Sequence, residues 1–139
     1  MVSFFYQNNF KVRNELSLEK WIKFIEDQEL KEAGELNFIL CEDNYLLDMN
    51  VKYLKHNTLT DVITFDYTID NIISGDVYIS IERVQENASD LDLHLLDELN
   101  RVMVHGVLHL CGYKDKTDEE LSLMRSKEDY YLSLRTFKN

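Results

Sequence analysis

Hydrophobic and polar residues follow two different periods along this chain. Aromatic and β-branched runs with the pattern of strands occupy residues 2–7, 36–41, 61–67 and 76–81. Apolar residues at helical spacing predict helices that begin after Ser17, at Asp43, near Asp90 and near Thr117. Gly34 is expected to end the first helix, and residues 71–75 are expected to form a turn. Strands that alternate with helices in this way indicate an α/β fold.

Length and composition agree with one domain that spans residues 1–139. The chain is 45% hydrophobic, so it can bury a core without disulfide bridges. Cys41 and Cys111 are therefore expected to be reduced, buried thiols. We find neither a signal-peptide pattern nor an apolar run of the ~20 residues that span a bilayer, and we expect a cytoplasmic protein without a membrane partner.

The formal net charge of −11 argues against indiscriminate nucleic-acid binding, which depends on neutralising phosphates with Lys and Arg. A local basic groove is still compatible with this charge. Lys52, Lys55 and His56 form one small basic cluster, although such residues are ordinarily solvated surface charges.

The strongest chemical signal is the order HxxxHxxGxxD in Val104 to Asp115. His105 and His109 are one helical turn apart and point the same way, and a turn at Gly112 can bring Asp115 back to them. Asp118 is a second candidate for the third ligand, and a thiolate from Cys111 is conceivable. The alternative is that both histidines are ordinary core or surface residues.

Three protein ligands leave a metal position open for water, which is typical of a catalytic site. Zinc can lower the pKa of such a water to about 7, and a set of two histidines and one carboxylate also suits iron, manganese or nickel. Position 106 is Gly rather than the general-base Glu of zinc proteases, so peptide hydrolysis of that kind is not expected. The residues indicate a metal-dependent hydrolase.

The segment HGVLHLCGYKD, residues 105–115, resembles the signature HGxLHLxGYDH of the YbeY family of endoribonucleases. The segment TDVITF, residues 60–65, resembles the TDVLSF strand of that family, and GDVYIS, residues 75–80, resembles its GDI-type strand. The order and separation of these blocks also fit, so the resemblance covers roughly residues 35–132.

This resemblance implies a mixed sheet of about four strands packed with about five helices, in which the histidine helix lines a cleft with a zinc ion. It implies a single-strand-specific endoribonuclease that acts in 3′-end maturation of small-subunit (16S) rRNA and in ribosome quality control. RNA and the ribosome are then the expected partners, and no DNA partner is expected.

Two positions depart from the family pattern. Asp115 stands where the family has a third histidine ligand, and an aspartate can also bind the metal. Leu54 replaces an arginine that would contact phosphate, and the nearby Lys52 and Lys55 offer only point charges. Asp61 matches a family residue that lines the cleft. Its side chain is expected either to contact the substrate or a metal-binding residue, or to be an ordinary turn residue at the end of the strand.

The sequence therefore predicts cleavage of RNA phosphodiesters at a metal held by His105, His109 and Asp115. Either a metal-bound water or the 2′-hydroxyl of the substrate is compatible with the residues as nucleophile. Leu54 favours one alternative, a ribosome assembly factor that keeps the metal for structure. The acidic charge favours another, a metal hydrolase of a small molecule.

Overall fold

The structure is a computed structural model that describes residues 1–54 and 60–137. Its strands are β1 (Val2–Tyr6), β2 (Glu32–Cys41), β3 (Val62–Asp66) and β4 (Ile72–Ser80). Its helices are α1 (Glu15–Gln28), α2 (Asp43–Leu54), α3 (Ile81–Asp90), α4 (Leu95–Leu110) and α5 (Asp118–Ser133). A mixed sheet of four strands with five helices, within the described residues, confirms the expected fold class.

The sheet has the strand order β1-β2-β4-β3. Strand β2 pairs in parallel with both β1 and β4, while β3 pairs antiparallel with β4. Helix α1 forms the crossover that two neighbouring parallel strands such as β1 and β2 require.

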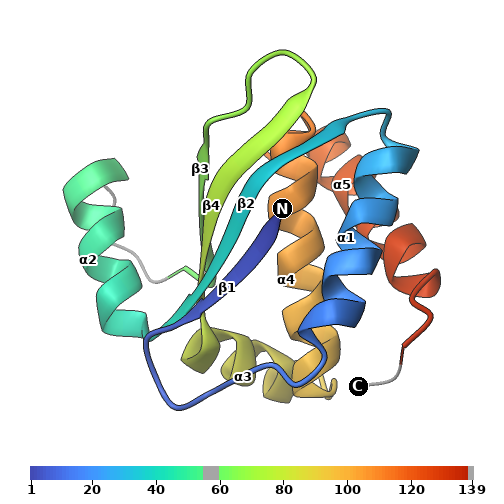
Figure 1. Ribbon diagram of the computed structural model, residues 1–139. Coiled ribbons are helices and arrows are strands. Elements are labelled where there is room, and N and C mark those ends of the chain that lie inside the picture. The colour runs from blue at the N-terminus through green and yellow to red at the C-terminus, as the bar shows by residue number, and fades with distance from the viewer. Residues whose placement is uncertain (55–59, 138–139) are drawn as a thin grey trace.

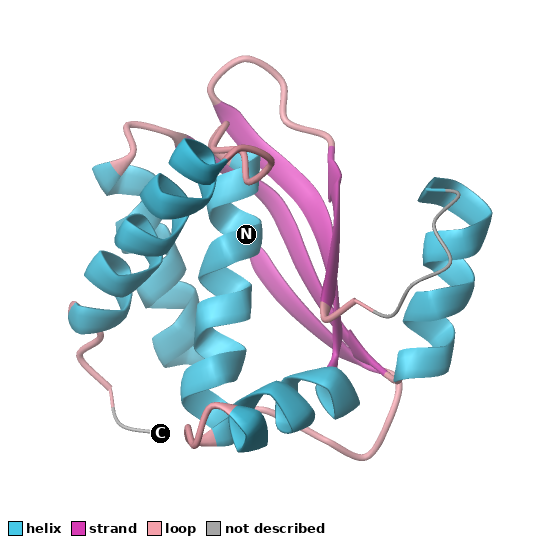
Figure 2. Ribbon diagram, turned by 180° about the vertical axis from the view of Figure 1, so that it is seen from behind, coloured by secondary structure: helices cyan, strands magenta, loops and turns pink. Residues whose placement is uncertain are grey.

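Helices cover the two faces of the sheet unequally (Figures 1 and 2). Helices α1, α4 and α5 lie on one face, and α2 stands apart on the other. The main core lies between the sheet and the three helices, and its fully buried members include Phe38, Val77 and Leu108. A smaller cluster under α2 contains Leu46, Met49 and Ile63. Helix α4 is thus the central helix, and it carries both histidines of the sequence motif.

Helix α4 packs unusually closely on the sheet at Gly106. A Cβ atom at this position would lie 2.9 Å from Cγ1 of Val77 and 3.4 Å from Oγ1 of Thr64. Glycine is therefore required here by close packing of the helix on β3 and β4.

The structure corrects several element boundaries. Helix α1 begins at Glu15, three residues before the predicted start, and ends at Gln28. Gly34 does not end that helix but lies in β2, where a Cβ would meet the carbonyl oxygen of Ile73 at 2.4 Å. Most of the predicted turn at residues 71–75 belongs to β4, because the chain reverses earlier, near Asp70, whose φ is 54°.

Helix α3 was not predicted. It directly follows β4, and the hydroxyl of Ser80 accepts a hydrogen bond from the backbone N–H of Arg83 to cap its first turn. Few strongly apolar side chains mark it in the sequence, and its buried positions are Ile81, Val84 and Ala88. The strand and the helix therefore share a boundary that hydrophobic periodicity alone does not reveal.

The expected start of α5 and the expected burial of Trp21 are confirmed, and the cysteines agree in part. Thr117 begins α5 with a complete capping box in which Glu120 is the reciprocal partner. Trp21 is 4% exposed, as expected for a core residue. Cys41 and Cys111 are free thiols, the first buried and the second only partly so. Among the described residues, no helix is both long enough and apolar enough to cross a bilayer.

Candidate metal centre

The two histidines and Asp115 meet where α4 ends. Beyond the helix, Gly112 adopts a φ of 105°, and the N–H groups of Gly112 and Tyr113 donate to the carbonyls of His109 and Leu108. These two bonds are the Schellman arrangement that stops a helix and reverses the chain direction. The turn brings Asp115 back beside the last helical turn, as the sequence spacing predicts.

Three ligand atoms form a small triangle at this point. The Nε2 atoms of His105 and His109 are 3.0 Å apart, and Oδ2 of Asp115 lies 3.2 Å from each of them. A tetrahedral zinc ion with bonds of about 2.0–2.1 Å needs donor atoms about 3.3–3.4 Å apart. The triangle is close to this spacing, so the three residues fit one metal ion.

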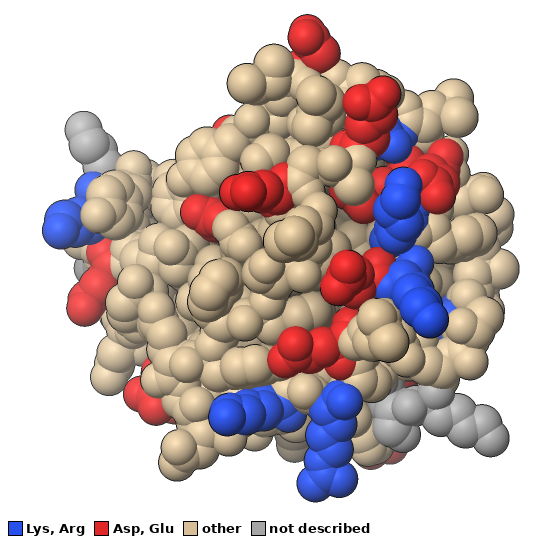
Figure 3. All heavy atoms as spheres, viewed as in Figure 1, with Lys and Arg blue, Asp and Glu red and all other residues tan. Residues whose placement is uncertain are grey.

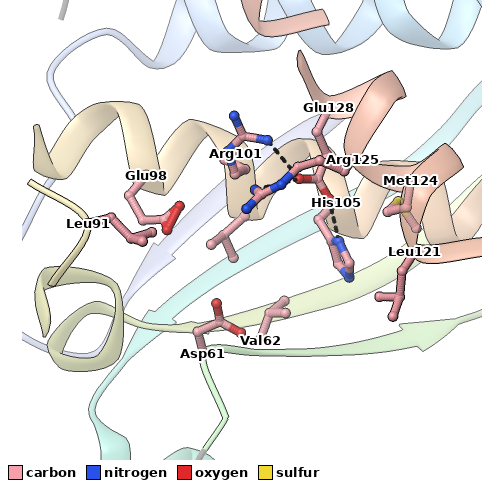
Figure 4. Close-up of a pocket in the computed structure, with 11 residues that line it drawn as sticks. Asp61, Val62, Leu91, Glu98, Arg101, His105, Leu121, Met124, Arg125 and Glu128 are labelled. Carbon is pink, nitrogen blue, oxygen red and sulfur yellow. Dashed lines mark hydrogen bonds and ion pairs between the residues drawn. The ribbon is translucent and has the colours of Figure 1, made fainter. Parts of the chain in front are cut away.

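The partners of the other ring nitrogens show which atoms are free to bind a cation. Nδ1 of His105 lies 2.7 Å from a carboxylate oxygen of Glu128 (Figure 4), and Nδ1 of His109 lies 3.0 Å from the carbonyl oxygen of Tyr113. Both partners are acceptors, so each Nδ1 carries the hydrogen and each Nε2 keeps its lone pair. With these tautomers, three electron-rich atoms face one another, an arrangement that a metal cation between them would stabilise.

Glu128 connects the candidate metal centre to helix α5. Its side chain is 6% exposed, and its second oxygen accepts a 3.0 Å hydrogen bond from Arg101 on α4. Burial alone would lower the pKa of His105, but the hydrogen bond and charge of Glu128, with the charge of Asp115, raise it overall. The surroundings of His105 therefore favour a positive charge at this ring.

A cleft of about 950 Å³ opens at the triangle. Asp61 and Thr64 line one side of it, and the segment after α4 lines the other. That segment contributes the side chains of Lys114 and Lys116, which the sequence did not single out as candidates. On the face shown in Figure 3, acidic and basic side chains are interspersed rather than gathered in one basic surface. Within the cleft itself, Lys114 and Lys116 are the lysines among the described lining residues.

Comparison with known proteins agrees with this geometry. The sequence model of the family described as "Endoribonuclease YbeY" matches residues 5–135. The protein named endoribonuclease YbeY from Flavobacterium psychrophilum is 55% identical over 134 residues, which cover 96% of each chain. The chain belongs to the YbeY endoribonuclease family.

Further comparisons extend the likeness to YbeY. Its counterpart from Flavobacterium johnsoniae is 48% identical over 134 residues, again with 96% of each chain covered. The solution structure of TM1509 from Thermotoga maritima superimposes with a TM-score of 0.68 at 24% identity, covering 96% of this chain and 87% of that one. This second likeness shows a shared fold.

Some of the other predicted site residues of this YbeY chain line the cleft, and others do not. Asp61 lines the cleft beside His105. Lys52 does not line it, and its ammonium lies 5.6 Å from the centre of the Tyr53 ring. Lys55, like His56, lies outside the described residues. Leu54, at the position where the resemblance implies an arginine, lines the cleft.

The alternative ligands are not brought to the triangle. Among the described residues, the group with metal-ligand spacing contains His105, His109 and Asp115. Asp118 instead opens helix α5. Burial raises the pKa of the Cys111 thiol to about 12, which disfavours the thiolate that a metal would need.

Sequence reasoning missed Glu128, although it contacts His105 directly. A signal was present, because Glu128 lies between Met124 and Tyr131 on the apolar stripe of the predicted last helix. A charged residue in such a stripe is buried only when it is paired. Without the structure, nothing identifies its partner 23 residues earlier.

Glu29, in the segment after α1, is linked to the candidate metal centre through Tyr113. Its carboxylate accepts hydrogen bonds from the hydroxyls of Tyr131 and, at 2.7 Å, Tyr113, and Lys127 lies 3.4 Å away. Tyr113 in turn supplies the carbonyl that holds the His109 ring. Burial alone would raise the pKa of Glu29, but the two hydroxyls and Lys127 more than compensate, and the pKa lies below its ordinary value.

This pKa shift predicts how Glu29 contributes to stability. Because the folded-state pKa is lowered, the contribution is fully present above the unfolded value of about 4.3 and is lost as the pH falls through the folded value. Glu29→Gln should therefore destabilise the protein most near pH 7, and its difference from the native protein should shrink in acid. Urea unfolding of both proteins at several pH values tests this, and a difference that grew in acid would contradict it.

Proposed function

We propose that this protein is a metal-dependent endoribonuclease that hydrolyses phosphodiester bonds in single-stranded RNA. His105, His109 and Asp115 hold the ion, for which zinc is the preferred occupant. The observation that carries the proposal is the convergence of two unprotonated ring nitrogens and a carboxylate at the edge of a cleft, in a chain of the YbeY family.

The bound metal would polarise a phosphoryl oxygen and supply hydroxide near neutral pH. Residues of the chain position the metal ligands and bind the RNA. Glu128 and the carbonyl of Tyr113 fix the tautomer and orientation of the two imidazoles. Lys114 and Lys116 offer positive charge to phosphates along the cleft. We further propose small-subunit rRNA, near its 3′ end, as the substrate, in keeping with the implied ribosome partnership.

One observation favours a second function. Leu54 lines the cleft at the family's arginine position, and leucine cannot bind phosphate. A protein that binds RNA or the ribosome with a structural metal, and without turnover, is therefore the rival. Lys114 and Lys116 offer positive charge to phosphate in either case, so cleavage itself decides between the two functions.

The test compares the purified protein with two histidine variants. The metal is identified by elemental analysis, and single-stranded rRNA fragments are incubated with the native protein, His105→Ala and His94→Asn. His94 only caps α4, accepting from the N–H of Leu96, and asparagine preserves such a cap, so this variant is the matched control.

Cleavage by the native protein and by the control, but not by His105→Ala, supports the proposal. Chelation should abolish this cleavage and added zinc should restore it, which excludes a contaminating nuclease. Binding without cleavage would replace the proposal by the assembly factor. If the protein neither cleaved nor bound RNA, a hydrolase of a small molecule would be the remaining function.

A further inference from the structure

A second hollow, of about 380 Å³, adjoins the candidate metal centre (Figure 4). We call it the side pocket. Asp61, Val62 and His105 line both the side pocket and the cleft, so the two are neighbours. The other apolar walls of the side pocket are Leu91, Val102, Leu121 and Met124. Its volume and largely apolar lining are typical of sites for small organic groups.

Two carboxylates are directed into this apolar space. Glu98 extends from α4 and Asp61 from the start of β3, on opposite sides of the side pocket (Figure 4). Glu98 is only 5% exposed, and its carboxylate forms no hydrogen bond or close ion pair with any residue that the structure describes, although the charges of Arg101 and Arg125 act on it from nearby. A buried carboxylate without a partner is costly. A ligand that donates hydrogen bonds to the Glu98 carboxylate would offset this cost.

The cationic side chains of the side pocket differ in how firmly they are held. Arg101 is bound to Glu128 at 3.0 Å and to Asp129 at 2.6 Å. The side chain of Arg125 is 59% exposed, and its contact with Glu128 is 3.7 Å long. Arg125 is therefore available to a ligand, whereas Arg101 is already used within the protein.

We propose that the side pocket receives a guanine base of the RNA strand whose backbone lies at the candidate metal centre. The inference rests on the proposed function, because that function brings the strand to the cleft. Single-stranded RNA is generally recognised through bases that are turned out of the stack and read along their edges. The apolar walls would enclose the faces of such a base.

Guanine is the base whose edge matches the polar groups. Its N1–H and amino group are adjacent donors that one carboxylate can accept together, and its O6 and N7 are acceptors for an arginine. Uracil has one such donor between two carbonyl oxygens, which a carboxylate repels. Adenine and cytosine each have an amino group beside an acceptor nitrogen, so they can donate a hydrogen bond to only one of the two carboxylate oxygens.

The first experiment measures binding without cleavage. Guanosine and uridine 5′-monophosphates are titrated into the zinc-loaded protein, and binding is followed by NMR shifts and calorimetry. Guanosine monophosphate should bind about tenfold more tightly, and Glu98→Gln should remove this preference. Glu119→Gln carries the same charge change at an exposed position of α5 and should leave it intact.

The second experiment measures cleavage. Oligonucleotides that contain one guanosine, inosine or uridine in an otherwise uniform strand are cut by the native protein and by Glu98→Gln. The native protein should prefer guanosine over inosine, which lacks the amino group, and the variant should cut all three alike. Leu121→Trp, which fills the mouth of the side pocket from an exposed position, should reduce the same preference.

Each result separates this inference from the proposed function. Cleavage of all three strands at equal rates by the native protein, with equal binding of the two nucleotides, would overturn the side pocket as a base site. Tight binding of Mg²⁺ that Glu98→Gln abolishes, without any nucleotide preference, would overturn it in favour of a second cation site. Absence of any RNA cleavage would count against the proposed function, whereas the nucleotide titrations would still decide the base site.

Discussion

Asp115→Ala is expected to abolish detectable RNA cleavage and to release the metal. The change leaves two imidazoles as the only ligands of the group His105, His109 and Asp115. Loss of a residue that merely orients a metal ligand typically costs about 10–100-fold in metal affinity, and loss of a ligand itself should cost more. Zinc affinity should therefore fall by at least about 100-fold, as measured by competition with a chromogenic chelator.

Two further variants make this prediction specific. Asp115→His restores a third ligand of the kind that the family signature carries, so it should keep the metal and measurable cleavage. Asp118→Ala removes a carboxylate that is outside the group, and it should behave like the native protein in both assays. If Asp115→Ala bound zinc as tightly as the native protein, the assignment of the ligands would be wrong.

Glu128→Ala is expected to weaken both the fold and the metal site. It removes the buried partner of Arg101 and of His105, and breaking a buried ion pair typically costs 3–5 kcal/mol. Asp129 still pairs with Arg101, so we expect about 3 kcal/mol in the free energy of unfolding. Metal affinity should fall by about 10–100-fold, because the His105 ring loses its orienting acceptor.

Chemical denaturation and zinc competition measure the two effects separately. Lys23→Ala is the matched control, because Lys23 pairs with Asp27 at 2.8 Å on an exposed surface. Exposed pairs of this kind contribute little to stability, so this variant should be nearly as stable as the native protein and should keep its metal affinity. A Glu128→Ala protein as stable as the Lys23→Ala control would show that Glu128 does not have the structural role assigned to it.

The candidate ligands could be predicted because their spacing is local. Within residues 105–115, one helical turn sets the relation between the histidines, and the positive φ of Gly112 returns the chain toward them. Each of these relations depends on neighbouring residues, and sequence periodicity reports neighbouring residues well.

The surroundings of the ligands could not be predicted in the same way. Glu128 meets His105 across 23 positions, and Glu29 meets Tyr113 across 84. The first pairing depends on how α4 and α5 pack, and the second on how the ends of α1 and α4 meet, which a single sequence does not specify. Helix α3 was missed for a different reason, since it follows β4 without an intervening turn signal.

The close contact at Gly106 has a consequence for how an RNA strand can be accommodated. With almost no space between the backbone of α4 and Val77, the helix has no freedom to slide or rotate against β4. The imidazoles and the strand side of the cleft, where Thr64 lies, then behave as one rigid block. Adjustment to strands of different shape then falls to margins of the cleft that are built from connecting segments, such as residues 112–116 between α4 and α5.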